Sequence, residues 1–269
     1  MSAGKKIGLS FIGSGTFGTM INQITSKSHA FQQKFNLINI FTRSSGLDFQ
    51  KDVLQNPKVQ AVYICSPDLQ HDSQAIACLQ ADKHVFSEKP LIDWQSVIKT
   101  AQQTSKVLQL GFHRRESSSY QKLKSVCLRK SGYPRSLIFR TRDPVFNCQE
   151  DTQKNQQDLD TIITQSVCHE IDLLSWLFPE GSIKFSVVKG MPNCGVWMEG
   201  TVEHNNGEST SICIDFTKEY SYYTQEIYMV DNENKTQLFG HDYDPKTAKI
   251  VNPKTGDTMF CELWKDEYV

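Results

Sequence analysis

The chain has 269 residues, of which 38% are hydrophobic and 22% charged, and its formal net charge is −1. This composition is typical of a globular protein and excludes the disordered and collagenous classes, while the near-zero charge gives no electrostatic basis for binding nucleic acid or a membrane surface. The eight cysteines show no CxxC pair and no zinc-ligand spacing, so we expect reduced thiols and no metal site. Because the sequence shows neither a signal-peptide core nor an apolar run of membrane length, we expect a cytoplasmic protein with a small-molecule ligand.

The first part of the chain alternates between apolar strands and amphipathic helices. We expect strands over residues 7–13, 35–42, 59–67, 83–90 and 107–115, with helices starting at Thr16 and over residues 73–81 and 94–103. Apolar strands separated by helices indicate a parallel sheet that is covered on both faces. The sequence therefore predicts an α/β fold whose N-terminal domain, residues 1–115, is a doubly wound Rossmann sheet.

The pattern changes from residue 116 onward. A polar helix over residues 118–132, a strand over 134–144 and a helix over 166–178 precede strand-like runs at 183–190, 195–204, 210–217, 225–230 and 235–240. Turn residues such as those at 205–207 separate these runs, as in an antiparallel meander. We therefore expect residues 116–269 to form an α+β domain with a mostly antiparallel, open sheet.

A glycine-rich turn follows the first strand and opens the first helix. It consists of Gly13, Ser14, Gly15, Thr16, Phe17 and Gly18, in the pattern GxGxxG. Glycines in such a turn allow a tight bend, close approach of a pyrophosphate to the helix N-terminus, and close packing of helix on strand. The position of the motif in a βαβ unit favours a dinucleotide-binding site over an ordinary glycine-rich turn.

The end of the second strand indicates which dinucleotide is bound. An NAD site carries an Asp or Glu here that binds the ribose 2′-hydroxyl, whereas this chain has Thr42, Arg43, Ser44 and Ser45. Arg43 and the neighbouring hydroxyls can bind a 2′-phosphate, and no carboxylate opposes it. We expect NADP as the cofactor, with NAD as the alternative if Arg43 is only a solvated loop charge.

Polar residues also follow the next two strands. Ser66 and Pro67 end one strand, and Glu88, Lys89 and Pro90 end the other. We expect them beside the cofactor, because ligands of open parallel sheets bind at the carboxyl ends of the strands. Lys89 can stabilise charge on a substrate oxygen, and Pro90 can provide a cis or tightly bent link that aims it. We group His71 with the cofactor-binding residues, at a helix start rather than in catalysis.

These motifs, in this order, resemble the Gfo/Idh/MocA family of NAD(P)-dependent oxidoreductases and, within it, the inositol 2-dehydrogenase branch. Besides the glycine turn and the EKP segment, the matching positions are Gly111, Phe112, Arg114 and Arg115 of a GFxRR segment, Arg142, Asp143 and Pro144 at a strand end, and His169, Asp172, Trp176 and Leu177 of an HxxDxxxWL helix. The resemblance covers nearly the whole chain.

The resemblance implies hydride transfer between a nicotinamide cofactor and a secondary alcohol carbon of a polyol, inositol or sugar-like substrate. It implies that Lys89 corresponds to the family's conserved lysine and that His169 exchanges the hydroxyl proton, a task that suits an imidazole. It also implies a homodimer or homotetramer formed through the open face of the C-terminal sheet.

Some positions depart from the family's pattern. Gln165 stands where relatives commonly carry an aspartate one helical turn before the histidine, so we count Gln165 among the catalytic candidates. Asp160 and Thr161 replace a pair of glycines, which restricts the backbone there.

Two further departures lie in the C-terminal domain. The segment 221–226 keeps Tyr223 and Gln225 of the inositol branch but not its acid and arginine. Relatives continue with a long helix after a segment that resembles residues 260–268, so we expect the usual C-terminal helix to be lacking. These departures leave a second hypothesis open, a catalytically impaired protein that senses NADP(H) or acts as a scaffold. An enzyme should bring Lys89 and His169 to one cavity.

Overall fold

The computed structural model describes residues 6–116, 118–128, 132–144, 159–191, 195–220, 223–232, 234, 236–244 and 249–251. Within this part the chain divides into two units, one ending at Phe112 and the other beginning at His113. Among the described helices, none is both long and apolar enough to cross a membrane.

The first unit is built on a five-stranded sheet in which all neighbouring strands run parallel. Its strands are β1 (Ile7–Ile12), β2 (Phe35–Phe41), β3 (Ala61–Ile64), β4 (His84–Ser87) and β5 (Leu108–Leu110), and they lie in the order β2-β1-β3-β4-β5. The helices are α1 (Thr16–Lys27), α2 (His29–Lys34), α3 (His71–Gln80) and α4 (Trp94–Thr104), with a π-helix at Phe49–Leu54 and a 3-10 turn at Asp68–Gln70. The predicted doubly wound sheet is confirmed.

Each face of this sheet is buried under different helices, because successive side chains of a strand point to opposite faces. Leu9 and Phe11 of β1 pack with Ile21 of α1 in one cluster. Val62 of β3 belongs to a second cluster that includes Ala75 of α3, Val97 of α4 and residues of the π-helix. The sheet order reverses between β1 and β3, so the crevice of the fold is expected at their carboxyl ends.

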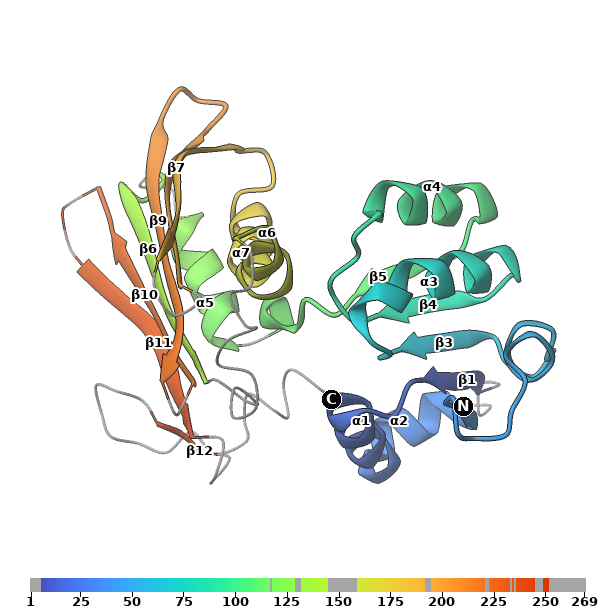
Figure 1. Cartoon of the computed structure of the whole chain (residues 1–269). Helices are drawn as coiled ribbons and strands as arrows, with labels where there is room; N and C mark the ends of the chain where they lie inside the picture. The colour runs from blue at the N-terminus through green and yellow to red at the C-terminus, as the bar shows by residue number, and fades with distance from the viewer. Residues whose placement is uncertain are drawn as a thin grey trace. The chain divides into compact units, whose positions relative to one another are not determined.

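The second unit pairs helices with a seven-stranded sheet. Its elements are α5 (Ser118–Cys127), β6 (Ser136–Pro144), α6 (Leu159–Ile162), α7 (Cys168–Leu177), β7 (Ser182–Met191), β8 (Gly195–Glu203), β9 (Ser209–Tyr220), β10 (Tyr223–Val230), β11 (Thr236–Asp244) and β12 (Lys249–Val251). Figure 1 shows α5, α6 and α7 on one face of this sheet. The mostly antiparallel sheet predicted from sequence is confirmed.

The simple meander is wrong at one point. The strand order is β12-β11-β10-β6-β9-β8-β7, so β6 lies between β9 and β10, which are consecutive in sequence. β6 pairs in parallel with β9 and antiparallel with β10. An alternating hydrophobic pattern reports which face of a strand is buried but not which strands are its neighbours, so the pattern could not show this insertion.

The two faces of the second sheet differ in chemistry. On the helix-covered face, Leu137 and Phe139 of β6 pack with Leu174 of α7 and other fully buried apolar residues. Arg140 and Arg142, which alternate with them along β6, make ion pairs with Asp215 at 3.4 and 2.6 Å. Around these residues, the open face is therefore polar, and its charged side chains form ion pairs with one another.

Several sequence expectations fall outside the described residues. They concern residues 221–222, residues 260–268 with the helix expected to be lacking beyond them, and three of the cysteines, Cys148, Cys194 and Cys261. The five described cysteines, Cys65, Cys78, Cys127, Cys168 and Cys213, are free thiols.

Candidate functional site

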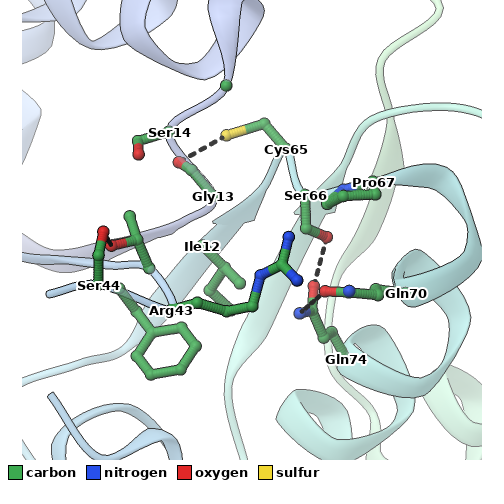
Figure 2. A pocket seen from close by; sticks show the side chains of 13 residues that line it. Ile12, Gly13, Ser14, Arg43, Ser44, Cys65, Ser66, Pro67, Gln70 and Gln74 are labelled. Atoms are coloured by element: carbon green, nitrogen blue, oxygen red, sulfur yellow. Dashed lines mark hydrogen bonds between the residues drawn. The ribbon is translucent and has the colours of Figure 1, made fainter. Parts of the chain in front are cut away.

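A pocket of about 460 Å³ lies at the carboxyl ends of β1, β2 and β3, where the sheet order reverses (Figure 2). The described residues that line it all belong to the first unit: Ile12, Gly13, Ser14, Gly15, Phe41, Thr42, Arg43, Ser44, Cys65, Ser66, Pro67, Gln70 and Gln74. The structure thus brings together three sequence motifs that lie tens of residues apart. The side chains of Thr16 and Phe17 lie outside the described part of the structure.

Each glycine of the turn has a distinct structural reason. Gly13 has φ +101°, and a Cβ there would lie 2.5 Å from the carbonyl oxygen of Cys65. A Cβ at Gly18 would lie 2.7 Å from the Cys65 Sγ, so this glycine allows α1 to pack closely on the end of β3. A Cβ at Gly15 would meet no described atom within 4 Å. The space beside Gly15 is therefore open at the first turn of α1.

The N-terminus of α1 is suited to an anion. Gly15 is the N-cap residue and makes no side-chain capping hydrogen bond. The first turn of α1 has main-chain N–H groups and the positive end of the helix dipole at its start, where Gly15 lines the pocket. A pyrophosphate fits this cradle, since the absence of a Cβ at Gly15 lets it approach the main chain.

The Thr42–Ser45 turn forms another wall of the pocket. The Ser45 hydroxyl donates to the Thr42 carbonyl at 2.8 Å and accepts from the Thr42 N–H at 3.1 Å, which fixes the turn. Figure 2 shows the Arg43 side chain extending across the pocket toward Ser66 and Gln70. The described lining contains a guanidinium and no carboxylate, so it presents a positive field to a bound phosphate.

The wall after β3 includes two residues that sequence reasoning missed. The Ser66 hydroxyl donates to Gln74 Oε1 at 2.6 Å, and Gln74 Nε2 donates to Gln70 Oε1 at 3.3 Å. Gln70 and Gln74 are four residues apart at the start of α3, which places both on the side that faces the pocket. Their position shortly after Ser66-Pro67 was the only sequence signal that could have placed them in the pocket. Glutamine is common outside binding sites, so its presence alone did not indicate one.

The segment after β4 carries the predicted lysine. Lys89 is half-buried, and the Lys89-Pro90 peptide bond is cis, one of the two forms predicted for it. Beside it, Glu88 accepts a hydrogen bond from the Tyr63 hydroxyl at 2.5 Å. Burial raises the pKa of the Glu88 carboxyl, although the Tyr63 hydrogen bond and the nearby charges of Lys89 and His71 oppose this increase.

His71 is buried at the start of α3 and is not among the residues that line the pocket. Its ring contacts the carbonyl oxygens of Ser66 and Pro90. Its relation to the pocket is therefore indirect, through Ser66.

In the second unit, His169 occupies the first turn of α7 and is 9% exposed. Its ring centroid lies 5.2 Å from that of His113. Gln165 lies in a π-helix, Ile163–Val167, directly before α7, so the expected α-helical spacing between Gln165 and His169 is wrong. A π-helix has i→i+5 hydrogen bonds, and its wider turn changes which side chains share a face. Such segments occur frequently at functional sites.

A buried polar cluster anchors α7 beside His169. Glu170 is fully buried, and its Oε1 accepts hydrogen bonds from Arg114 at 2.7 Å, Thr141 at 2.8 Å and Gln225 at 2.9 Å. Asp172 accepts a hydrogen bond from Arg115 Nε at 2.8 Å. Paired buried charges of this kind fix the orientation of a helix. The arginines of the GFxRR segment thus hold the helix that carries the histidine.

The fold and the pocket define the class: a dinucleotide-binding Rossmann domain followed by a domain with an open, mostly antiparallel sheet. Within the described residues, no group of three or more His, Cys, Asp or Glu side chains is placed to hold a metal ion. The profile of the Gfo/Idh/MocA family, described as an oxidoreductase family with an NAD-binding Rossmann fold, matches residues 15–112. The first unit is therefore similar to the NAD-binding domain of this oxidoreductase family.

Relatives that match in sequence include inositol dehydrogenases. Inositol 2-dehydrogenase 1 of Mycolicibacterium vanbaalenii is 30% identical over 148 residues, which cover 53% of this chain and 41% of the relative. Myo-inositol 2-dehydrogenase of Thermotoga maritima is 36% identical over 98 residues, which cover 35% of this chain and 29% of the relative. The matched stretches therefore span less than half the length of these relatives.

Solved structures resemble the chain over nearly its whole length. Scyllo-inositol dehydrogenase from Lactobacillus casei, with bound NAD(H) and scyllo-inositol, superposes with a TM-score of 0.71 at 20% identity and covers 98% of this chain and 86% of its own. A probable dehydrogenase from Thermotoga maritima superposes with a TM-score of 0.68 at 21% identity and covers 97% and 85%. At such identities these structures establish the fold.

Proposed function

We propose that the chain is an NADP-preferring oxidoreductase that acts on a polyol, inositol or other sugar-like secondary alcohol. The observation that carries the cofactor assignment is the pocket at the end of β1. Gly15 and Arg43 both line it, and none of its described lining residues is a carboxylate. The names of the relatives support the substrate class.

The residues of the first unit hold the dinucleotide. The main chain of Gly13–Gly15 and the first turn of α1 bind the pyrophosphate, and Arg43 with the hydroxyls of Thr42 and Ser44 binds the 2′-phosphate. When bound, the nicotinamide supplies or accepts the hydride. Arg43 donates several N–H groups in a planar fork that matches a phosphate, which is why it is expected to discriminate NADP from NAD.

Lys89 and His169 provide the polar chemistry at the substrate. The ammonium of Lys89 donates to the substrate oxygen and stabilises the charge that develops there. The imidazole of His169 takes the hydroxyl proton during oxidation and returns it during reduction. That the two side chains meet at one cavity is a prediction, because Lys89 belongs to the first unit and His169 to the second.

The experiment is an assay of the purified chain with NADP and NADPH against a panel of inositols, polyols and ketoses, followed at the nicotinamide absorbance. Lys89→Ala should lower turnover by about 100-fold or more, as removal of a positioned proton donor does, whereas the control Lys99→Ala, on the exposed face of α4, should leave it unchanged. Dinucleotide binding without turnover of any compound would contradict the oxidoreductase assignment. Turnover that Lys89→Ala leaves unchanged would remove Lys89 from the reaction.

The family resemblance also supports a homodimer or homotetramer formed through the open face of the second sheet. Light scattering coupled to size-exclusion chromatography tests this assignment. Arg142→Ala, which removes the ion pair to Asp215 on that face, should weaken the assembly. A monomer at all concentrations would contradict it.

A further inference from the structure

His71 is almost completely buried, at 1% exposure, beneath the wall of the dinucleotide pocket. Each of its ring nitrogens lies at hydrogen-bond distance from a main-chain carbonyl oxygen. Nε2 is 2.7 Å from the carbonyl oxygen of Ser66, and Nδ1 is 3.0 Å from that of Pro90. The ring thus bridges the segments that follow β3 and β4.

The two partners determine how many protons the ring carries. A carbonyl oxygen can only accept, and a neutral imidazole has one N–H donor and one bare nitrogen. In the neutral form one ring nitrogen would direct its lone pair at a carbonyl oxygen in a buried site, which leaves two acceptors opposed and unsatisfied. The doubly protonated imidazolium donates to both, so the geometry fits the charged form.

The charges around His71 are compatible with a buried cation. Glu88, directly after β4, is an acidic group whose carboxyl interacts electrostatically with His71, and Lys89 and the Tyr63 hydroxyl act on the same carboxyl. Asp72, next to His71 on α3, accepts main-chain hydrogen bonds from Ile92 at 3.1 Å and from Asp93 at 2.8 Å. Glu88 is therefore the acidic group that acts on His71 through its electrostatic field, while Asp72 is engaged by the start of α4.

The two carbonyls belong to segments with different tasks. Ser66 lines the pocket, and its hydroxyl is held by Gln74. Pro90 directly follows Lys89. We propose that His71 is a positioning residue, held as an imidazolium, that fastens the pocket wall at Ser66 to the lysine-bearing segment at Pro90. The role assigned to Lys89 and the use of NADPH as a probe rest on the proposed function, but the charge state of His71 does not.

The charge state can be read without any turnover. In the full chain labelled with ¹⁵N-histidine, long-range ¹H–¹⁵N correlation spectra distinguish a ring with two protonated nitrogens from a neutral tautomer. Loss of one signal in His71→Gln assigns the residue. Both nitrogens of His71 should carry a proton in the folded chain, because each faces a carbonyl oxygen that can only accept. A bare ring nitrogen on His71 in folded, dinucleotide-binding protein would overturn the proposal.

A binding experiment tests the consequence for the pocket. His71→Gln keeps donor hydrogens but cannot reach both carbonyls, so NADPH should bind about tenfold more weakly, the loss expected for one charge-assisted hydrogen bond. The control His29→Gln, at an exposed position, should show wild-type affinity.

The outcomes separate this proposal from the proposed function. If no substrate is turned over, the NMR and NADPH-binding results still decide the role of His71. If His71→Gln does not fold, the spectra of the wild-type chain still decide its charge state. Wild-type NADPH affinity in a folded His71→Gln variant would refute the positioning role.

Discussion

Alanine at Gly15 is predicted to abolish dinucleotide binding without destabilising the protein. The backbone at Gly15, with φ −62° and ψ −174°, is open to any L-residue, and a Cβ there meets no described atom within 4 Å. Alanine is a slightly poorer N-cap than glycine, which lowers the free energy of unfolding by about 0.5 kcal/mol. Alanine also restricts the unfolded chain, which raises the free energy of unfolding by about 0.5 kcal/mol, so the two effects nearly cancel. The added methyl group, however, occupies the space that the pyrophosphate needs.

The other two glycines of the turn should behave in the opposite way. Gly13→Ala places an L-residue at φ +101°, which costs about 1 to 2 kcal/mol, and brings its Cβ to 2.5 Å from the Cys65 carbonyl oxygen. Gly18→Ala forces its Cβ against the Cys65 Sγ at 2.7 Å. Overpacking of this kind costs about 1 to 3 kcal/mol, so the two variants should lose about 2 to 5 and about 1 to 3 kcal/mol of unfolding free energy, respectively.

The assay is thermal unfolding with and without NADPH, combined with NADPH fluorescence titration. Gly15→Ala should unfold at the wild-type temperature, with no ligand-induced shift, whereas Gly18→Ala should unfold about 2 to 10 °C lower. Gly190→Ala, which also meets no described atom within 4 Å but lies on β7, is the matched control and should still bind. Wild-type NADPH affinity in Gly15→Ala would refute the assignment of the pyrophosphate to this turn.

Four further predictions concern other residues. Arg43→Ala should weaken NADPH binding by about 10- to 100-fold and leave NADH binding unchanged in parallel titrations. An equal loss of affinity for NADPH and NADH would show that Arg43 does not recognise the 2′-phosphate. Gln165→Asp should raise turnover if the missing carboxylate limits the enzyme, and unchanged steady-state kinetics would show that it does not. Burial raises the pKa of the Cys65 thiol to about 12, so this thiol should stay protonated up to pH 9. Peptide mapping should therefore show no increase in the alkylation of Cys65 between pH 7 and 9, and an increase would contradict its burial. Arg114→Met leaves the Glu170 carboxylate buried without its cation and should lower the unfolding free energy by about 3 to 5 kcal/mol in urea titrations, while a loss under about 1 kcal/mol, the value of an exposed pair, would show that solvent reaches the cluster.

The features that sequence predicted correctly are local. The strand Ile7–Ile12, the glycine turn and the helix from Thr16 follow one another within a few turns of chain, and each has its own signal. The parallel sheet followed from apolar strands that alternate with helices. The convergence of Thr42–Ser44 and Ser66 on the glycine turn was predictable as well, because the carboxyl ends of parallel strands meet at one edge.

The features that sequence missed depend on contacts between distant segments. The insertion of β6 between β9 and β10 is a choice of neighbours that strand periodicity does not contain. The π-helix at Ile163–Val167 has no compositional signal, since the same residues can form an α-helix. The role proposed for His71 depends on two main-chain carbonyls, one of them 19 residues away. Every residue has a main-chain carbonyl, so the sequence does not show which carbonyls His71 contacts.

The central claim is that the chain binds a nicotinamide dinucleotide, with preference for NADP, at the Gly13–Gly18 turn. The most direct test is thermal unfolding of the full chain with NADPH, with NADH and with neither. A ligand at about 100 times its Kd stabilises the folded state by about 2.7 kcal/mol, which corresponds to a rise of about 5 to 10 °C. We predict that NADPH reaches this rise at lower concentration than NADH and that Gly15→Ala shows none. An unfolding temperature that neither dinucleotide raises, even at millimolar concentration, would contradict the claim.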